Sequence, residues 1–327
     1  MLLLFSLTLI PITQSDTIEH KTTKSNNTTP NILNPLIWRP REVQIIVNEK
    51  IKNRENFTLN ASIYLPIPMN LSSQTIHYPI NYNIQPDEYK IDSWGQKVAI
   101  YSRTLKPEEK LTINWKINAT VYTIRHLLFP WQVQGEIPSE IKEKYTADAI
   151  NYQIHNPLIQ NIVKEQTAKI KNPLIKSILL CQYVGDHLTY VLDDRWDDAP
   201  TVLTRGNGSC SEYCFVYIAL LRAAGIPARY MGGTVQKTNE YPYIDKVFHR
   251  IAEIYLPNYG WIPIDPTWTD SVKIPFLYFG SYQNNLLIFN IGGGPSEFLD
   301  WNYCHWEEFT PDSKNVTIDL SFTWKKL

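Results

Sequence analysis

The sequence predicts an α+β protein in which an antiparallel β-sandwich precedes a domain of mixed helices and strands. The hydrophobic period is two residues over much of residues 38–125, as in half-buried strands, and it becomes helical from Pro130 onward. The 327 residues are enough for two domains with separate cores. Hydrophobic residues make up 43% and charged residues 19%, which is typical of a globular chain and not of a disordered one.

The first residues are typical of an export signal. Leu2 to Ile12 form an apolar run that is too short to span a bilayer comfortably but fits the core of a signal peptide. We therefore interpret residues 1–15 as a signal-like segment and residues 16–37, which are rich in Ser, Thr, Asn and Pro, as a flexible linker. No Lys or Arg precedes the run, so a mis-assigned start or a buried N-terminal strand stays an alternative.

Eight glycosylation sequons agree with export to the cell surface or the extracellular space, although an Asn- and Thr-rich chain also makes such triplets by chance. They begin at Asn26, Asn27, Asn56, Asn60, Asn70, Asn118, Asn207 and Asn315. Membrane contact is expected only through an uncleaved N-terminal segment. The formal net charge of −1, with no basic cluster among aromatic residues, gives no support for a nucleic-acid partner.

Residues 38–125 are predicted to form the sandwich. Between Leu111 and Val121 apolar residues alternate with Thr, Asn and Lys, which is the pattern of a strand with one wet face. Similar runs separated by Pro, Asn and Gly turns cover residues 43–51, 57–65, 90–100 and 101–105.

Residues 126–327 are predicted to form the second domain, with a helical lead-in and C-terminal strands. Apolar stripes at helical spacing predict helices over Pro138–Lys144, Leu158–Ala168 and Leu174–His187. After the glycines at 292–294, alternating residues predict one or two closing strands.

The segment RGNGSCSEYC places Cys210 on the first turn of a predicted helix. Ser209 can cap that helix while Glu212 closes a capping box, and Gly225 ends it. The unpaired N–H groups and the positive end of the helix dipole favour a thiolate over a thiol, and the same N–H groups are candidate donors to an oxyanion. A cysteine is more often a small buried hydrophobe, which is how we interpret Cys214.

A second segment, from His249 to Asp265, predicts a hairpin with an imidazole on one strand and a carboxylate beside the other. Either residue alone is more often structural. Together with Cys210 they supply a nucleophile, a general base and an acid that orients the base, and so predict a catalytic triad. The sequence does not specify the register of this hairpin, and a bulge is one way to bring the two side chains together.

The stretches GSCSEY, ALLRAAGIPARYMGG and HRIAEIYLPNYGWIPIDPT resemble the transglutaminase-like superfamily. The resemblance implies a papain-like core with Cys210 as nucleophile, His249 as base and Asp265 as orienting acid. More loosely, residues 38–125 are similar to the β-domain that precedes this core in many microbial relatives. Two positions depart from the family pattern: Cys214, where a small residue is common, and Arg250, where an apolar residue is usual.

The resulting functional hypothesis is an exported thiol enzyme that acts through a cysteine thioester on peptide, isopeptide or glutamine amide bonds. A hydrolase that cuts peptides or proteins of cell-wall or surface material is favoured by analogy. The alternatives are a transglutaminase that cross-links amines and a non-catalytic binding or structural protein. No cofactor and no metal is predicted, because Cys304 and His305 lack a partner pair at zinc-like spacing. A bridge between Cys181 and Cys304 has only weak support.

Overall fold

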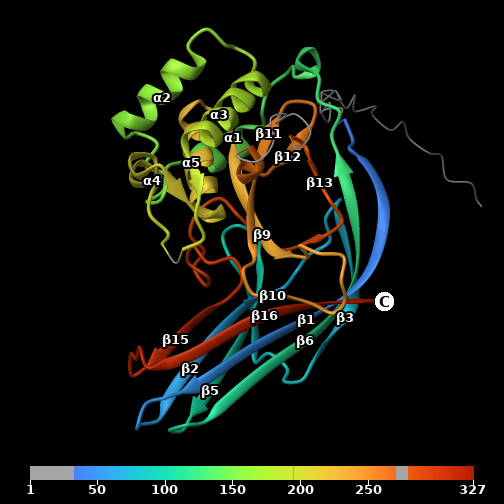
Figure 1. Ribbon diagram of the computed structural model, residues 1–327, viewed down its shortest axis with the longest axis vertical. Coiled ribbons are helices and arrows are strands. Elements are labelled where there is room, and N and C mark those ends of the chain that lie inside the picture. Colours follow the sequence, from blue (N-terminus) through green and yellow to red (C-terminus); the bar gives the residue numbers. More distant parts are fainter. Residues whose placement is uncertain (1–32, 194, 270–278) are drawn as a thin grey trace, which may run out of the picture. The chain divides into compact units, whose positions relative to one another are not determined.

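The computed structural model describes residues 33–193, 195–269 and 279–327 (Figure 1). The signal-like residues 1–15, nearly all of the predicted linker and the sequons at Asn26 and Asn27 lie outside the described residues. Within the described residues, no helix has the length and apolar character needed to cross a bilayer.

Antiparallel sheets built largely from residues 36–125 form the N-terminal part, as predicted. One sheet has six strands: β10, β16, β1, β6 and β13 in order, with β3 also paired to β6. A second sheet has the order β15-β2-β5-β4. The N-terminal strands are β1 (Leu36–Asn53), β2 (Leu59–Pro66), β3 (Gln74–Tyr82), β4 (Glu88–Ile91), β5 (Lys97–Leu105) and β6 (Lys110–Arg125).

Alternating residues place one face of each long strand in a shared core. On β1 the buried residues include Val43, Ile45 and Val47, and the residues between them are partly exposed. A hydrogen bond of 2.8 Å from Trp115 on β6 to Tyr101 on β5 joins a strand of one sheet to a strand of the other. The apolar faces of the two sheets therefore pack against each other, which is the arrangement of a sandwich.

The strand boundaries differ from the prediction in three places. Residues 101–105 continue β5 and are not a separate strand, β3 was not predicted, and β1 begins at Leu36 inside the predicted linker. In β3 the exposed residues His77, Tyr78 and Pro79 interrupt the alternation, and the register with β6 shifts there. A bulged edge strand of this kind lacks the regular period on which the prediction depended.

The two C-terminal strands belong to the N-terminal sheets. β16 (Val316–Lys326) pairs with β1, and β15 (Trp306–Thr310) pairs with β2. The sequence correctly predicted closing strands here but grouped them with the catalytic domain of residues 126–327. The difference arises because hydrophobic alternation shows that a segment is a strand and does not show which sheet it joins.

Helices follow the sandwich as predicted (Figure 1). The predicted lead-in helices are α1 (Ser139–Thr146), α2 (Pro157–Thr167) and α3 (Pro173–His187), and Asn156 and Asn172 cap the last two. A short helix, α4 (Ala199–Arg205), was not predicted; it precedes α5 (Cys210–Ala223). The short elements are η1 (Pro130–Gln132), η2 (Pro266–Thr269), β7 (Thr189–Tyr190), β8 (Asn207–Gly208), β10 (Tyr243–Asp245) and β13 (Ser281–Tyr282).

A third antiparallel sheet, in the order β12-β11-β9-β14, packs against α5. Its strands are β9 (Ala228–Val235), β11 (His249–Leu256), β12 (Gly260–Ile264) and β14 (Leu286–Gly292). Every residue of α5 from Cys210 to Arg222 is buried. The helix that begins at Cys210 is therefore the centre of this part of the fold, and its first turn meets the start of β11.

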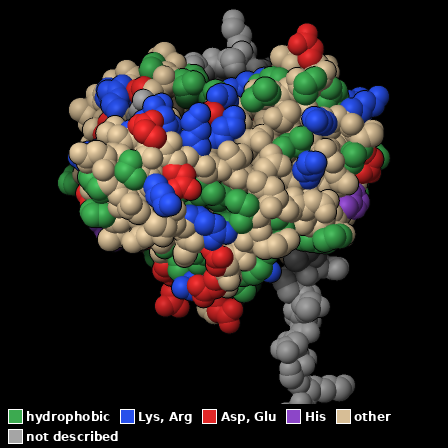
Figure 2. All heavy atoms as spheres, turned by 90° about the horizontal axis from the view of Figure 1, so that it is seen from below, with side chains coloured by type: hydrophobic (Ala, Val, Ile, Leu, Met, Phe, Trp, Pro, Cys, Tyr) green, Lys and Arg blue, Asp and Glu red, His purple; other side chains and the backbone are tan. Residues whose placement is uncertain are grey.

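The molecular surface is mixed in charge. Figure 2 shows basic side chains spread among acidic, apolar and uncharged groups on one face, in line with the formal net charge of −1.

Candidate active site

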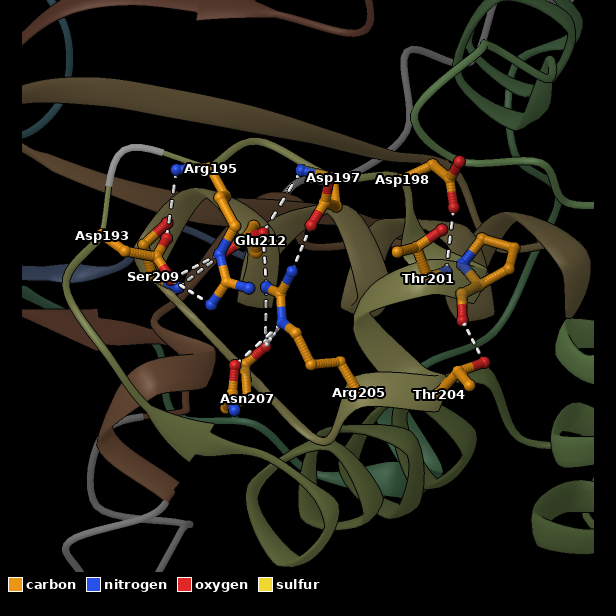
Figure 3. Close-up of polar contacts among 11 residues, drawn as sticks. Asp193, Arg195, Asp197, Asp198, Thr201, Thr204, Arg205, Asn207, Ser209 and Glu212 are labelled. Carbon is orange, nitrogen blue, oxygen red and sulfur yellow. Dashed lines mark hydrogen bonds and ion pairs between the residues drawn. The ribbon is translucent and has the colours of Figure 1, made fainter.

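A partly buried network of polar contacts holds the loop in front of α5 (Figure 3). The Arg205 guanidinium donates to the carboxylate of Glu212 at 2.7 Å and to the side-chain oxygen of Asn207 at 2.8 Å, and it also pairs with Asp197. The other carboxylate oxygen of Glu212 accepts the backbone N–H of Ser209 at 2.8 Å, which is one half of the predicted capping box. Glu212 thus links the preceding loop to the first turn of the helix that carries Cys210.

His249 and Asp265 meet at the edge of the third sheet. The ring nitrogen Nε2 of His249 and Oδ2 of Asp265 are 2.6 Å apart, a short hydrogen bond. β11 and β12 pair without a register shift, with Ala252 opposite Ile264. Continuing that register places Asp265 opposite Ile251, so its side chain reaches His249 along a diagonal and no bulge in the hairpin is needed.

Thr267 holds the second oxygen of Asp265. Its backbone N–H and its hydroxyl donate to Oδ1 at 3.1 and 2.6 Å. Both carboxylate oxygens are therefore engaged, one by the imidazole and one by Thr267, which fixes the carboxylate in the orientation that the histidine needs.

Cys210 lies in hydrogen-bond contact with His249. Burial opposes ionisation of the thiol, but the hydrogen bond to His249, the positive charge of that ring and the backbone N–H of Arg250 outweigh it, so the pKa of Cys210 is lowered. Burial likewise disfavours the charged ring, yet Asp265 and the sulfur raise the pKa of His249 well above its usual value. These opposite shifts favour a thiolate paired with an imidazolium.

The other cysteines provide an internal comparison. Cys181, Cys214 and Cys304 are all free and buried, and burial raises the pKa of each thiol. The suggested bridge between Cys181 and Cys304 is thus absent. Cys214 lies one turn after Cys210 on the same helix, and its sulfur contacts the carbonyl oxygen of Arg250 at 3.4 Å. Cys214 is buried, as predicted, and its pKa is raised. Burial alone therefore does not make a cysteine of this chain reactive.

Arg250 is a buried cation beside the thiol. Its guanidinium lies 4.5 Å from the ring centre of Tyr303 and 4.6 Å from that of Tyr230, and it also faces Trp196 and Phe215. The guanidinium donates to the carbonyl oxygen of Trp301, and its charge is a further influence that lowers the pKa of Cys210. A box of aromatic faces can hold a cation away from water.

The site lies at the edge of the core. Cys210 is 4% exposed, and the side chain of His249 is 18% exposed. Asn207, three residues before the thiol, is only half-buried, but its side chain is engaged by Arg205. The imidazole is therefore more exposed to solvent than the thiol is.

The structure brings together all three residues named from the sequence, and their catalytic role stays a prediction. The contributions of Thr267, Arg205 and Arg250 were not predicted from the sequence. Thr267 stands inside the quoted stretch IPIDPT, and an Asp-x-Thr spacing is a signal for a local side-chain hydrogen bond. Arg250 was noted as a departure from the family pattern, yet nothing in a single sequence shows that four aromatic rings surround it.

Comparison with known proteins bears on this arrangement. A profile described as the transglutaminase-like superfamily matches residues 160–266. The match includes Cys210, His249 and Asp265. The chain contains a transglutaminase-like core. This part of the molecule therefore has the fold and family that the sequence motifs indicated, as an α+β core that follows the β-sheets.

Two curated relatives match parts of the chain. An uncharacterised protein of Haemophilus influenzae is 32% identical over 156 residues, which are 39% of this chain and 42% of that protein. A protein-glutamine gamma-glutamyltransferase of Pseudomonas aeruginosa is 36% identical over 67 residues, or 19% of this chain and 10% of that protein. The chain thus matches less than half the length of either relative.

One solved structure matches nearly the whole chain. A protein of Cytophaga hutchinsonii described as a candidate cysteine protease covers 90% of this chain, with 93% of its own length, at a TM-score of 0.64 and 16% identity. At that identity the match supports the fold alone. It includes the N-terminal sheets as well as the transglutaminase-like core.

Proposed function

We propose that this chain is an exported thiol hydrolase that cleaves peptide, isopeptide or glutamine amide bonds through a Cys210 acyl-enzyme. One observation carries the proposal: of four buried cysteines, only Cys210 has a lowered pKa, and it contacts an imidazole that is hydrogen-bonded to Asp265. A thiolate, a proton donor and an orienting carboxylate are the groups that acyl transfer requires.

The chemistry would run in two steps. The Cys210 thiolate attacks the carbonyl carbon, and N–H groups at the start of α5 stabilise the oxyanion. Collapse of the tetrahedral species breaks the C–N bond, the amine leaves with a proton from His249, and a thioester remains. Water then attacks the thioester while His249 takes its proton, which releases the acid and regenerates the thiolate–imidazolium pair. Asp265 stays ionised throughout.

The proposed substrate is a peptide or protein of cell-wall or surface material, and the proposed location is the cell surface or the extracellular space. Both follow from the signal-like first residues and the sequons of the sequence.

A transglutaminase is the second candidate, because one relative is named a protein-glutamine gamma-glutamyltransferase. In that case an amine, and not water, resolves the same thioester. A labelled primary amine incubated with the protein and a glutamine peptide separates the two functions. Incorporation of the amine supports transfer, and release of ammonia without incorporation supports hydrolysis.

The decisive test is to trap the thioester with candidate wall peptides and detect it by mass spectrometry. We expect an acyl adduct on Cys210 that is absent in Cys210→Ala and present in Cys214→Ala. Cys214 is a matched control because it is buried on the same helix but has a raised pKa. If Cys210 reacts with iodoacetamide at neutral pH no faster than an ordinary thiol, the non-catalytic binding protein becomes the better explanation.

A further inference from the structure

A second buried polar group lies between the two N-terminal sheets, far from the candidate active site in the sequence. This inter-sheet cluster consists of Glu49 on β1, His305 directly before β15 and Glu307 on β15. Figure 1 shows β1 between β16 and β6, whereas β15 lies at the edge of the other sheet, beside β2. The cluster thus draws its side chains from both sheets of the sandwich.

Strand geometry explains why the side chains meet. Glu49 continues the buried alternation of Val47 and Ile51 on β1, so it faces the interior. Glu307 pairs directly with Ile63 of β2, which is fully buried. Because directly paired residues point to the same face of a sheet, Glu307 also faces the interior.

The distances suit a metal ion. One potential ligand atom from each of the three residues lies within 4.8 Å of the other two. Nδ1 of His305 and Oε1 of Glu307 are already 2.7 Å apart. The side chain of His305 is 22% exposed and that of Glu307 is 6% exposed, so the cluster reaches solvent through the imidazole.

Glu49 is the residue that requires an explanation. It is 0% exposed, and among the described residues no donor reaches either of its carboxylate oxygens. Burying a carboxylate without a partner is costly, whereas coordinating a cation satisfies it. An unpartnered, fully buried carboxylate that points at an imidazole and a second carboxylate is the donor set of a divalent-cation site.

We propose that Glu49, His305 and Glu307 bind one Zn²⁺ ion that joins the two sheets. Two carboxylates neutralise the charge of the ion, and an imidazole favours zinc over Mg²⁺ or Ca²⁺, which prefer oxygen ligands. His305 coordinates through Nδ1 in place of its hydrogen bond to Glu307. Three protein ligands leave a fourth position for water on the solvent side. The role of the ion is structural, because it connects β1 to β15.

The sequence predicts no metal here because His305 has no ligand partner at zinc-like spacing nearby. Glu49 is separated from it by most of the chain, and sheet pairing brings the two together. The rival explanation is that Glu49 is simply a neutral acid, since burial raises its pKa to about 8. Glu49→Gln separates the two explanations, because glutamine copies the shape of the neutral acid but is a poor zinc ligand.

The test uses the full chain carrying Cys210→Ala, so that the thiol and His249 do not bind the added metal. After treatment with EDTA and re-addition of Zn²⁺, we expect one bound Zn²⁺ per chain by elemental analysis and a rise in Tm of about 4 °C at a hundredfold excess over Kd. Both effects should disappear in Glu49→Gln and in His305→Gln. Failure of this test would leave the proposed enzymatic function untouched, because the two clusters share no residue.

An exposed histidine–glutamate pair in the same part of the chain is the matched control. Nε2 of His77 and Oε2 of Glu42 are 3.4 Å apart, with side chains 46% and 55% exposed. Glu42→Gln should keep the full zinc response. The proposal is overturned if Zn²⁺ neither binds nor raises the Tm, or if Glu49→Gln responds to zinc as strongly as the unaltered chain does.

Discussion

Two partly buried imidazole–carboxylate pairs in this molecule have nearly the same N···O distance and different neighbours. In the transglutaminase-like core, His249 and Asp265 are 2.6 Å apart, and between the N-terminal sheets His305 and Glu307 are 2.7 Å apart. The third group is a thiol, Cys210, in the first case and a second carboxylate, Glu49, in the second.

The neighbour decides which chemistry the pair can support. A thiol can give its proton to the imidazole and become a nucleophile, and the charge of Arg250 favours that ionisation. A second carboxylate adds negative charge instead: burial and Glu307 both raise the pKa of Glu49. Protonation of Glu49, or binding of a cation to it, removes the unfavourable energy of this buried negative charge. A histidine–carboxylate pair is therefore a candidate general base with its orienting acid at His249 and Asp265. At His305 and Glu307 such a pair is part of a candidate metal site.

Removing the imidazole beside the thiol should have the largest effect. In His249→Gln the burial of Cys210 is no longer outweighed, so its pKa rises and turnover should fall by about 10⁶-fold. The rate of iodoacetamide alkylation at neutral pH should fall with it. His305→Gln removes the imidazole of the other pair and should leave the alkylation rate unchanged. Equal losses in the two variants would show that the pairs are not functionally distinct.

Replacing the carboxylate in Asp265→Asn should lower turnover by about 10⁴-fold. The asparagine keeps the shape but loses the charge that raises the pKa of His249, so the imidazolium form is less favoured. The pH profile of turnover should lose activity at a lower pH on its alkaline side, because His249 loses the proton that it donates to the leaving amine more readily. Glu307→Gln is the matched change in the other pair, and a similar profile for both variants would contradict the assignment.

Arg250→Met should reduce the rate of alkylation at neutral pH by about tenfold, because loss of the buried positive charge raises the pKa of Cys210. Arg250→Lys keeps a charge and should restore part of the rate. Arg229 is a suitable control: it lies on the neighbouring strand and 3.9 Å from the ring centre of Trp261, and it pairs with Glu253. If Arg229→Met shifts the pH profile as much as Arg250→Met, the effect is general and not specific to the thiol.

Much of the core and its candidate site was predictable because the signals are local. The capping residues around Cys210, the helical stripes and the hairpin from His249 to Asp265 each occupy one continuous stretch. The spacing within these stretches indicates the helix start at Cys210 and the hairpin that carries His249 and Asp265. The motifs that resemble the transglutaminase-like superfamily lie in the same stretches. Local pattern and family resemblance therefore indicate the same three residues, Cys210, His249 and Asp265.

The parts that were not predicted depend on contacts between distant segments. The pairing of β16 with β1 joins opposite ends of the described chain, and no period or turn residue encodes it. The aromatic surroundings of Arg250 come from four separate segments. Glu49 is a charged group at a buried position of β1, where the alternation expects an apolar residue. That mismatch was the one sequence signal of the inter-sheet cluster.

A third histidine, His126, tests whether the carboxylate partner is what raises the pKa of the imidazole in the two pairs. His126 follows β6, and among the described residues its Nδ1 has no hydrogen-bond partner. Burial lowers its pKa from 6.5 to about 4, whereas His249 and His305, each beside a carboxylate, have raised pKa values. NMR titration of histidine-labelled, metal-free protein should show His126 titrating last as the pH falls. Resonances are assigned by replacing each histidine with glutamine.

The same shift predicts a dependence of stability on pH. Because the folded state disfavours the proton on His126, its contribution to stability is present above pH 6.5 and is lost as the pH falls towards 4. The difference is on the order of 3 kcal/mol in the free energy of unfolding. Urea unfolding should show a smaller loss on acidification in His126→Gln than in the unaltered chain. If all three histidines titrate together near their ordinary value, a neighbouring carboxylate does not control these rings, and the comparison between the two pairs loses its physical basis.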